Sequence, residues 1–251
     1  MSQRFLDQVV LVTGGSTGIG LAAAQLFVKE GAKVYITGRN ADSLEAARAT
    51  LGPKAVAVRS DVASLADLNA LRDQISAAGD RLDVIVANAG IAERNTFGET
   101  DEAAFDKTFD INVKGLFFTV QTMLPLLKDG GSVVLTASIV ANKGMPNLSL
   151  YNASKAAVRS FARSWSNDLK ARRIRVNAVS PGPVETPIMA NGLKMDAAQV
   201  DGFKAAVAQS APLGRFGEPE EIADAIAFLA SPAASYITGV ELSVDGGLAQ
   251  V

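Results

Sequence analysis

The sequence contains a tyrosine and a lysine spaced for shared proton chemistry. They are Tyr151 and Lys155, the ends of "YNASK". Positions four apart on an α-helix lie on one face, so the hydroxyl and the ammonium would be neighbours. A free tyrosine has a pKa of about 10, which must fall by roughly 2 to 3 pKa units before the phenol can act as a base near neutrality. A nearby cation lowers a phenol pKa, so the pair predicts a general acid and base.

The absence of two residue types excludes several other kinds of catalytic or metal site. The 251 residues include no His and no Cys. Disulfides, a thiolate nucleophile, a Ser-His-Asp triad and the usual zinc sites are therefore excluded, and no metal is expected. A formal charge of -2 argues against nucleic acid as a partner. No apolar run is long enough for a membrane helix and no signal peptide is recognisable, so we expect a soluble, cytoplasmic protein.

The elements that must position this pair follow an alternating pattern. Val- and Ile-rich runs predict strands at 8–12, 33–37, 54–58, 82–88, 131–138, 174–180 and 239–247. Helical periodicity predicts helices at 18–30, 41–50, 64–78, about 101–128, around Tyr151, and at about 219–230. Strands that are apolar on both faces predict a single α/β domain over residues 1–251. It would be a Rossmann-type doubly wound parallel sheet of about seven strands, with ligands bound at the carboxyl strand ends. The stretch at about 186–212 interrupts the alternation and is interpreted as a substrate lid.

A glycine-rich turn follows the first predicted strand and opens a helix. In "TGGSTGIG", Gly14, Gly18 and Gly20 are spaced to make a tight turn and admit a pyrophosphate to the backbone. The hydroxyls of Thr13, Ser16 and Thr17 could contact phosphate or cap the helix, and the sequence does not separate these roles. The turn predicts a dinucleotide site.

The end of the second strand indicates which dinucleotide binds. NAD proteins place an acid there against the ribose 2'-hydroxyl, whereas this chain has Arg39 and Asn40. A guanidinium suits a 2'-phosphate, so NADP(H) is the expected cofactor. Asp42 and Glu45 are interpreted as a helix-capping box.

These motifs together resemble the short-chain dehydrogenase/reductase family along essentially the whole chain. The resemblance depends on the glycine turn, "NAG" at 88–90, "DINVKG", Ser138, "YNASK" and "PGPVET" at 181–186, in that order. It implies hydride transfer by a homotetramer or dimer, with Asn112, Ser138, Tyr151 and Lys155 as the catalytic set. Ser138 would orient a carbonyl oxygen, and Lys155 would bind the nicotinamide ribose and pass protons to a water held by Asn112. The gap of four from tyrosine to lysine differs from the wider gap of the related enoyl reductases.

The resemblance also assigns cofactor contacts. Asp61 and Val62 would flank the adenine, although Asp61 could equally cap a helix, and Thr186 with Ile188 would fix the carboxamide. The full predicted cofactor set is Gly14, Ser16, Thr17, Gly18, Ile19, Arg39, Asn40, Asp61, Val62, Asn88, Ala89, Gly90, Tyr151, Lys155, Pro181, Gly182, Thr186 and Ile188.

The predicted substrate pocket is mainly apolar. Its candidate residues are Ile91, Glu93, Val140, Leu148, Met189 and Met195, which favour a hydrophobic ketone or secondary alcohol. For the two methionines, plain packing is an equally good interpretation.

Two other functions stay open. A 3-oxoacyl carrier-protein reductase would use the same centre, with Lys128, Arg172 and Arg173 as a basic rim for its acidic carrier. A non-catalytic dinucleotide-binding regulator is disfavoured, because it would need no acid beside the nicotinamide.

Overall fold

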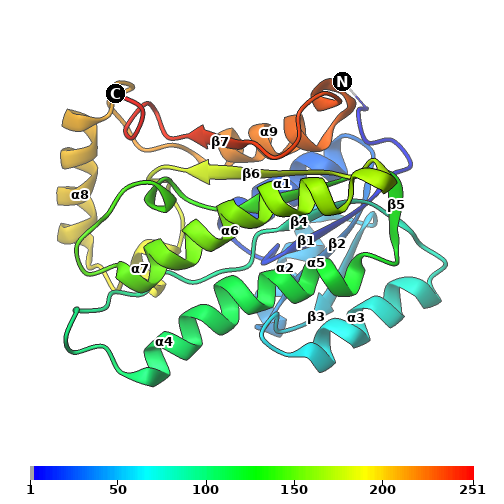
Figure 1. The fold of residues 1–251 in the computed structure, drawn as a ribbon, viewed down its shortest axis with the longest axis horizontal. Helices are drawn as coiled ribbons and strands as arrows, with labels where there is room; N and C mark the ends of the chain where they lie inside the picture. Colours follow the sequence, from blue (N-terminus) through cyan, green and yellow to red (C-terminus); the bar gives the residue numbers. More distant parts are fainter. Residues whose placement is uncertain (1–2) are drawn as a thin grey trace.

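Seven parallel strands form the central sheet, in the order β3-β2-β1-β4-β5-β6-β7 (Figure 1). The computed structural model describes residues 3–251. The strands are β1 (Val9–Thr13), β2 (Lys33–Gly38), β3 (Ala55–Arg59), β4 (Leu82–Ala87), β5 (Leu127–Thr136), β6 (Arg175–Pro181) and β7 (Glu241–Val244). All seven predicted strands are present, and the predicted doubly wound parallel fold is confirmed.

Helices cover both faces of the sheet (Figure 1). They are α1 (Gly18–Lys29), α2 (Ala41–Leu51), α3 (Leu65–Ala77), α4 (Glu102–Phe109), α5 (Leu116–Met123), α6 (Ser149–Asp168), α7 (Ile188–Asn191), α8 (Ala197–Ser210) and α9 (Pro219–Ala230). None of the helices within residues 3–251 has the length and apolar character needed to cross a membrane.

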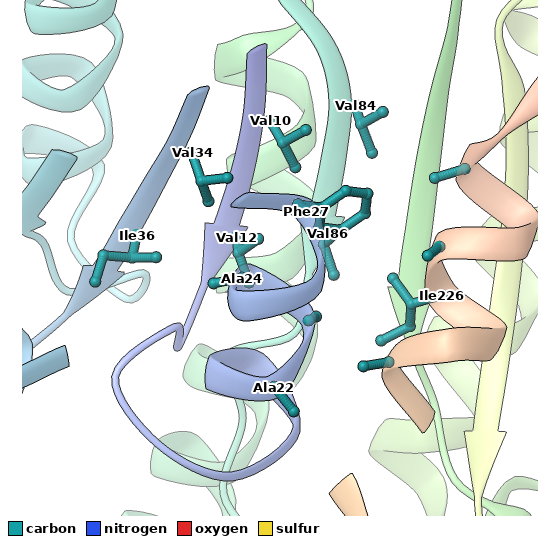
Figure 2. Close-up of a cluster of buried hydrophobic side chains, with 14 of the residues drawn as sticks. Val10, Val12, Ala22, Ala24, Phe27, Val34, Ile36, Val84, Val86 and Ile226 are labelled. Atoms are coloured by element: carbon teal, nitrogen blue, oxygen red, sulfur yellow. The ribbon is translucent and has the colours of Figure 1, made fainter. Parts of the chain in front are cut away.

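One face of the sheet packs against α1 and α9. Figure 2 shows Val10 and Val12 of β1 pointing toward Phe27 and the alanines of α1, with Ile226 of α9 alongside. The neighbouring residue Leu11 belongs instead to the core on the opposite face, with α3, α5 and α6. Side chains alternate along a strand, so a strand buried on both faces must be apolar at every position. This is why the Val-rich runs located the strands correctly.

The predicted helix at 101–128 is present from Glu102 to Met123 without interruption. It consists of α4, a π-helical turn (Asp110–Gly115) and α5, and it ends earlier than predicted. β5 then begins at Leu127, earlier than predicted, with a register irregularity against β4 between Leu82 and Val84. The two glycines at 130 and 131 hid the first part of this strand, because glycine disfavours regular strands.

Residues 186–212 form α7, a short link and α8. Asp196 begins α8 with a capping box to Gln199. Val207 of α8 packs with Ala211 and Phe216 in a small apolar cluster of its own, against which Met189 rests.

Candidate active site

Tyr151 and Lys155 lie on the first two turns of α6. Lys155 is 5% exposed, and its Nζ donates a hydrogen bond to the Thr136 carbonyl oxygen at 2.8 Å. The same Nζ lies 5.7 Å from the centroid of the Tyr151 ring. The end of β5 thus provides the one carbonyl that holds the buried ammonium, while the helix places the phenol beside it.

Ser138 follows the carboxyl end of β5 and faces this pair. It is buried and begins a short 3-10 turn (Ile139–Ala141), where its hydroxyl accepts a long hydrogen bond from the Val140 amide at 3.4 Å. A polar interaction with the Ser138 side chain acts to lower the Tyr151 pKa, so the two hydroxyls are neighbours.

Burial controls the protonation of both groups. Removal from water raises the pKa of the Tyr151 phenol above its usual 10, and the interaction with Ser138 opposes this only in part. Burial also lowers the pKa of Lys155 to about 8. The tyrosine pKa therefore moves in the direction opposite to the predicted lowering, because desolvation of the phenolate outweighs its favourable contacts. Tyr151 is a neutral phenol at pH 7, which is the form that donates a proton.

Asn112 lies in the π-helical turn and is almost fully buried. Its Oδ1 accepts from the Ile91 amide at 2.8 Å, and its Nδ2 donates to the Ile91 carbonyl at 2.8 Å and to Ser154 Oγ at 3.0 Å. Gly90 lies between this amide and the lysine: a Cβ there would come within 3.2 Å of Asn112 Oδ1 and 3.4 Å of Lys155 Nζ. The asparagine side chain therefore fixes the loop after β4 against α6.

The glycine turn is tied to the end of β4. Thr13 Oγ1 accepts from the amides of Asn88 and Ala89 at 3.0 and 3.1 Å, and Asn88 Nδ2 donates to the Thr13 carbonyl at 3.1 Å. Gly14 and Gly18 have φ angles of +64° and +53°, which side-chain-bearing residues rarely adopt. These bonds place the turn, the loop after β4 and the lysine in one region at the carboxyl edge of the sheet.

The amino end of α1 fits a phosphate. Thr17 is its N-cap residue but makes no side-chain cap, so the Thr17 hydroxyl leaves the first N–H groups of this helix open to a phosphate. Ile19, also assigned to the cofactor, packs in part against the core. Thr186, which precedes α7, lies over the turn, since a Cβ on Gly18 would come 3.1 Å from its Cγ2. This cradle is suited to a pyrophosphate.

Arg39, the predicted 2'-phosphate contact, and the neighbouring Asn40 differ in their contacts within the protein. Arg39 is exposed and forms no ion pair among residues 3–251, and Ser16 Oγ lies close beside Gly38 at the end of β2. Asn40 caps α2: its Oδ1 accepts a hydrogen bond from the Ser43 amide at 2.8 Å.

The predicted capping box of Asp42 and Glu45 is therefore wrong. Asn40 starts the helix two residues earlier than the box would place its cap. Glu45 forms an exposed ion pair with Arg48 at 2.6 Å instead. An asparagine side chain is at least as good a cap as an aspartate, and it competes for the same amide.

The other predicted cofactor residues lie at the ends of β3 and β6 and at the start of α7. Asp61 does not cap α3, because Ser64 takes that role. The Oδ1 atom of Asp61 accepts from the Ala63 amide at 3.0 Å. Val62 is buried against Gly115. Pro181 closes β6, and Gly182 donates to the Val244 carbonyl at 3.0 Å. Ile188 begins α7.

The predicted substrate residues divide into two groups. Ile91, Val140, Leu148 and Met195 are buried or partly buried around the active-site loops. Glu93 pairs with Lys107 at 2.7 Å, and Met189 packs on the α8 cluster, which is the plain packing role that the sequence left open.

A surface pocket lies next to these loops. It has a volume of about 400 Å³ between the loop after β4 and the start of α6, and Phe97, Phe105 and Leu150 line it with five polar or charged residues. None of the six predicted substrate residues lines this pocket.

The two threonines of the site differ in what the sequence indicates. The hydroxyl of Thr13, expected to contact phosphate or cap the helix, accepts the hydrogen bonds that anchor the loop after β4. Thr136, which holds Lys155 through its backbone carbonyl, was not predicted. A backbone contact such as that of Thr136 leaves no signal in residue type.

Comparison with known proteins finds a family and relatives that match nearly the whole chain. A family described as "Enoyl-(Acyl carrier protein) reductase" matches residues 14–249. The chain is 44% identical to oxidoreductase asL5 of Sarocladium schorii, over 99% of this chain and 98% of the relative. It is 37% identical to the NADP-dependent (R)-specific alcohol dehydrogenase of Lentilactobacillus kefiri, over 98% of both chains.

A carrier-protein reductase and a solved structure are also similar. The 3-oxoacyl-[acyl-carrier-protein] reductase FabG of Thermotoga maritima is 37% identical, over 98% of this chain and 99% of the relative. A short-chain dehydrogenase/reductase of Brucella melitensis, described as a glucose/ribitol dehydrogenase, superposes with a TM-score of 0.93 at 34% identity, covering 100% of both chains. With the glycine turn, the loop after β4 and the Tyr151–Lys155 pair gathered at one sheet edge, these matches establish that the chain is an oxidoreductase of the short-chain dehydrogenase/reductase family.

Proposed function

We propose that the protein transfers a hydride between NADP(H) and a hydrophobic ketone or secondary alcohol. The observation that carries the proposal is the buried Lys155 ammonium beside the Tyr151 phenol and Ser138, at the same sheet edge as the glycine turn. Burying a lysine is costly, and a fold that needs only to be stable has no use for it there.

The chemistry follows from the protonation states. Bound NADPH would supply the hydride. Ser138 donates to the carbonyl oxygen and orients it, and Tyr151 donates its proton to that oxygen as negative charge develops. The raised pKa of Tyr151 keeps this proton in place at pH 7, so the tyrosine is in the form that can donate it. The charge of Lys155 stabilises the phenolate that is left behind.

Two observations support NADP(H) over NAD(H). Arg39 is unpaired among residues 3–251, and it follows β2, where an acid would select NAD(H). The Lentilactobacillus relative is described as NADP-dependent. A guanidinium with no carboxylate partner is free to bind a 2'-phosphate with both arms.

Reduction of 3-oxoacyl carrier proteins is the second candidate, supported by the Thermotoga relative. The expected basic rim, however, is not placed to bind an acidic carrier protein. Lys128 pairs with Asp83 at 2.9 Å and Arg172 with Asp129 at 2.7 Å. Lys128 also lies near the amino end of β5, whereas Ser138 follows its carboxyl end. These cations are at the wrong end of the sheet for a carrier that must reach the active site.

The test is a substrate panel followed by NADPH absorbance, with aryl ketones, β-ketoesters and carrier-linked acyl groups. We expect turnover of aryl ketones, and Tyr151→Phe should lower kcat at least 100-fold while NADPH binding stays nearly unchanged. Tyr236→Phe is the matched control, since Tyr236 is fully exposed. Substantial activity of Tyr151→Phe would mean that another group donates the proton, and no turnover of any substrate would favour the non-catalytic regulator.

Cofactor choice is tested separately with Arg39→Leu. The variant should raise KM for NADPH by roughly 10- to 100-fold, as expected for loss of a charged hydrogen bond of about 1.5–3 kcal/mol. KM for NADH should change little. Equal effects on both cofactors would remove the 2'-phosphate assignment.

A further inference from the structure

Glu241, the first residue of β7, holds three other elements with one carboxylate. Its Oε1 accepts from Asn142 Nδ2 at 2.7 Å and from Ser180 Oγ at 2.7 Å. Its Oε2 forms an ion pair with Arg159 Nε at 2.5 Å, and the glutamate side chain is only 11% exposed. A carboxylate this buried is stable only when its oxygens are paired, and these contacts pair both of them.

All three partners belong to elements that build the active site. Asn142 closes the 3-10 turn that Ser138 opens, with backbone bonds from the Ala141 amide to the Ser138 carbonyl at 2.9 Å and from the Asn142 amide to the Ile139 carbonyl at 3.1 Å. Ser180 is fully buried in β6 and directly precedes Pro181 and Gly182.

Arg159 connects the same carboxylate to the helix of the reacting pair. It lies four residues after Lys155 and eight after Tyr151, so all three share one face of α6. The carboxylate therefore joins the turn that carries Ser138 to the helix that carries Tyr151.

We propose that Glu241 is a positioning residue for Ser138. It fixes the serine turn relative to α6, so that the Ser138 and Tyr151 hydroxyls stay aimed at the same carbonyl oxygen. This inference rests on the proposed function, in which both hydroxyls contact that oxygen. The link to the serine turn runs through Oε1 and Asn142, and the link to α6 runs through Oε2 and Arg159. Displacing a reacting group by about 1 Å can cost on the order of 100-fold in rate.

The experiment compares Glu241→Ala, Glu241→Gln, Asn142→Ala and Arg159→Met in ketone reduction. Glu241→Ala and Asn142→Ala should each lower kcat by on the order of 10- to 100-fold while KM for NADPH stays within about twofold. Glu241→Gln keeps an oxygen acceptor for Asn142 and Ser180, so it should restore most of kcat. Arg159→Met breaks the link to α6 and should lower kcat as well. Asn167→Ala is the matched control. Asn167 is an exposed residue of α6 whose Nδ2 donates to the Arg163 carbonyl, and the kcat of this variant should stay near that of the unaltered protein.

A background lacking Ser138 separates positioning from simple stabilisation of β7. In Ser138→Ala, adding Glu241→Ala should lower kcat by less than about threefold, because the group it positions is already gone. Full additivity would overturn the inference, as would a kcat for Asn142→Ala within twofold of the unaltered protein. If Glu241→Ala does not fold, the asparagine and glutamine variants carry the test. If Tyr151→Phe is inactive but Asn142→Ala is fully active, the positioning role fails and the proposed function stands.

Discussion

Lys155→Met should make the protein inactive without making it less stable at pH 7. Burial lowers the lysine pKa from 10.5 to about 8, which corresponds to a penalty of about 3 kcal/mol for the charged form in the folded state. The hydrogen bond from Nζ to the Thr136 carbonyl returns about 1.5–3 kcal/mol of this. Methionine removes both terms with a similar volume. The folding free energy should therefore change little, or improve by up to about 2 kcal/mol, while kcat falls at least 100-fold.

The pH dependence of this comparison has a definite sign. The folded-state pKa of Lys155 lies below that of the unfolded chain, so the penalty is fully present below pH 8 and is relieved between about 8 and 10.5. The stability of the unaltered protein should therefore rise relative to Lys155→Met by up to about 3 kcal/mol across this window. At about 2–4 °C per kcal/mol, thermal unfolding followed by circular dichroism should resolve the change.

Lys170→Met is the matched control for that experiment. Lys170 is exposed just beyond the end of α6 and forms no ion pair among residues 3–251. Its Tm should differ from that of the unaltered protein by the same amount at pH 7 and pH 10, and its activity should be normal. A Lys155→Met difference that is independent of pH, or a loss of more than about 2 kcal/mol at pH 7, would refute the assignment of burial as the source of the shift.

Three further substitutions test the loop after β4 and two contacts that stabilise the fold. Gly90→Ala places a methyl group 3.2 Å from Asn112 Oδ1, so kcat should fall while the circular dichroism spectrum is retained; unchanged kinetics would show that the loop yields freely. Asp80→Ala leaves the buried Tyr35 hydroxyl without its 2.5 Å acceptor and should cost about 1–3 kcal/mol in urea unfolding, with no loss if the hydroxyl finds another partner. Asn40→Ala removes the α2 cap and should cost about 1 kcal/mol in the same assay, whereas Asp42→Ala, which caps nothing, should cost less.

The sheet could be predicted from residue type because burial on both faces leaves a direct mark on composition. Val10, Leu11 and Val12 must all be apolar, since they alternate between two cores. The π-helical turn between α4 and α5 has no such mark. The turn goes with two hydrogen bonds between Asn112 and the backbone of Ile91, and a contact 21 residues distant does not appear in local periodicity.

The protonation of the site was predicted in the wrong direction for a similar reason. The spacing of Tyr151 and Lys155 indicates proximity, and proximity to a cation lowers a phenol pKa. The opposing contribution is desolvation, which depends on how completely the surrounding chain covers both groups. The capping box shows the same limit: Asp42 and Glu45 have the right spacing, but the side chain of Asn40 accepts from the Ser43 amide and begins the helix.

The placement of β1 has a consequence for synthesis on the ribosome. β1 pairs with β2 on one side and with β4 on the other, so its second edge stays open until residues 82–87 have been made. An unpaired apolar strand is a template for intermolecular association, and the nascent chain is most vulnerable in that interval. Residues 241–244 pair last, at the opposite margin, and a truncated product would lack the carboxylate that joins the serine turn to α6.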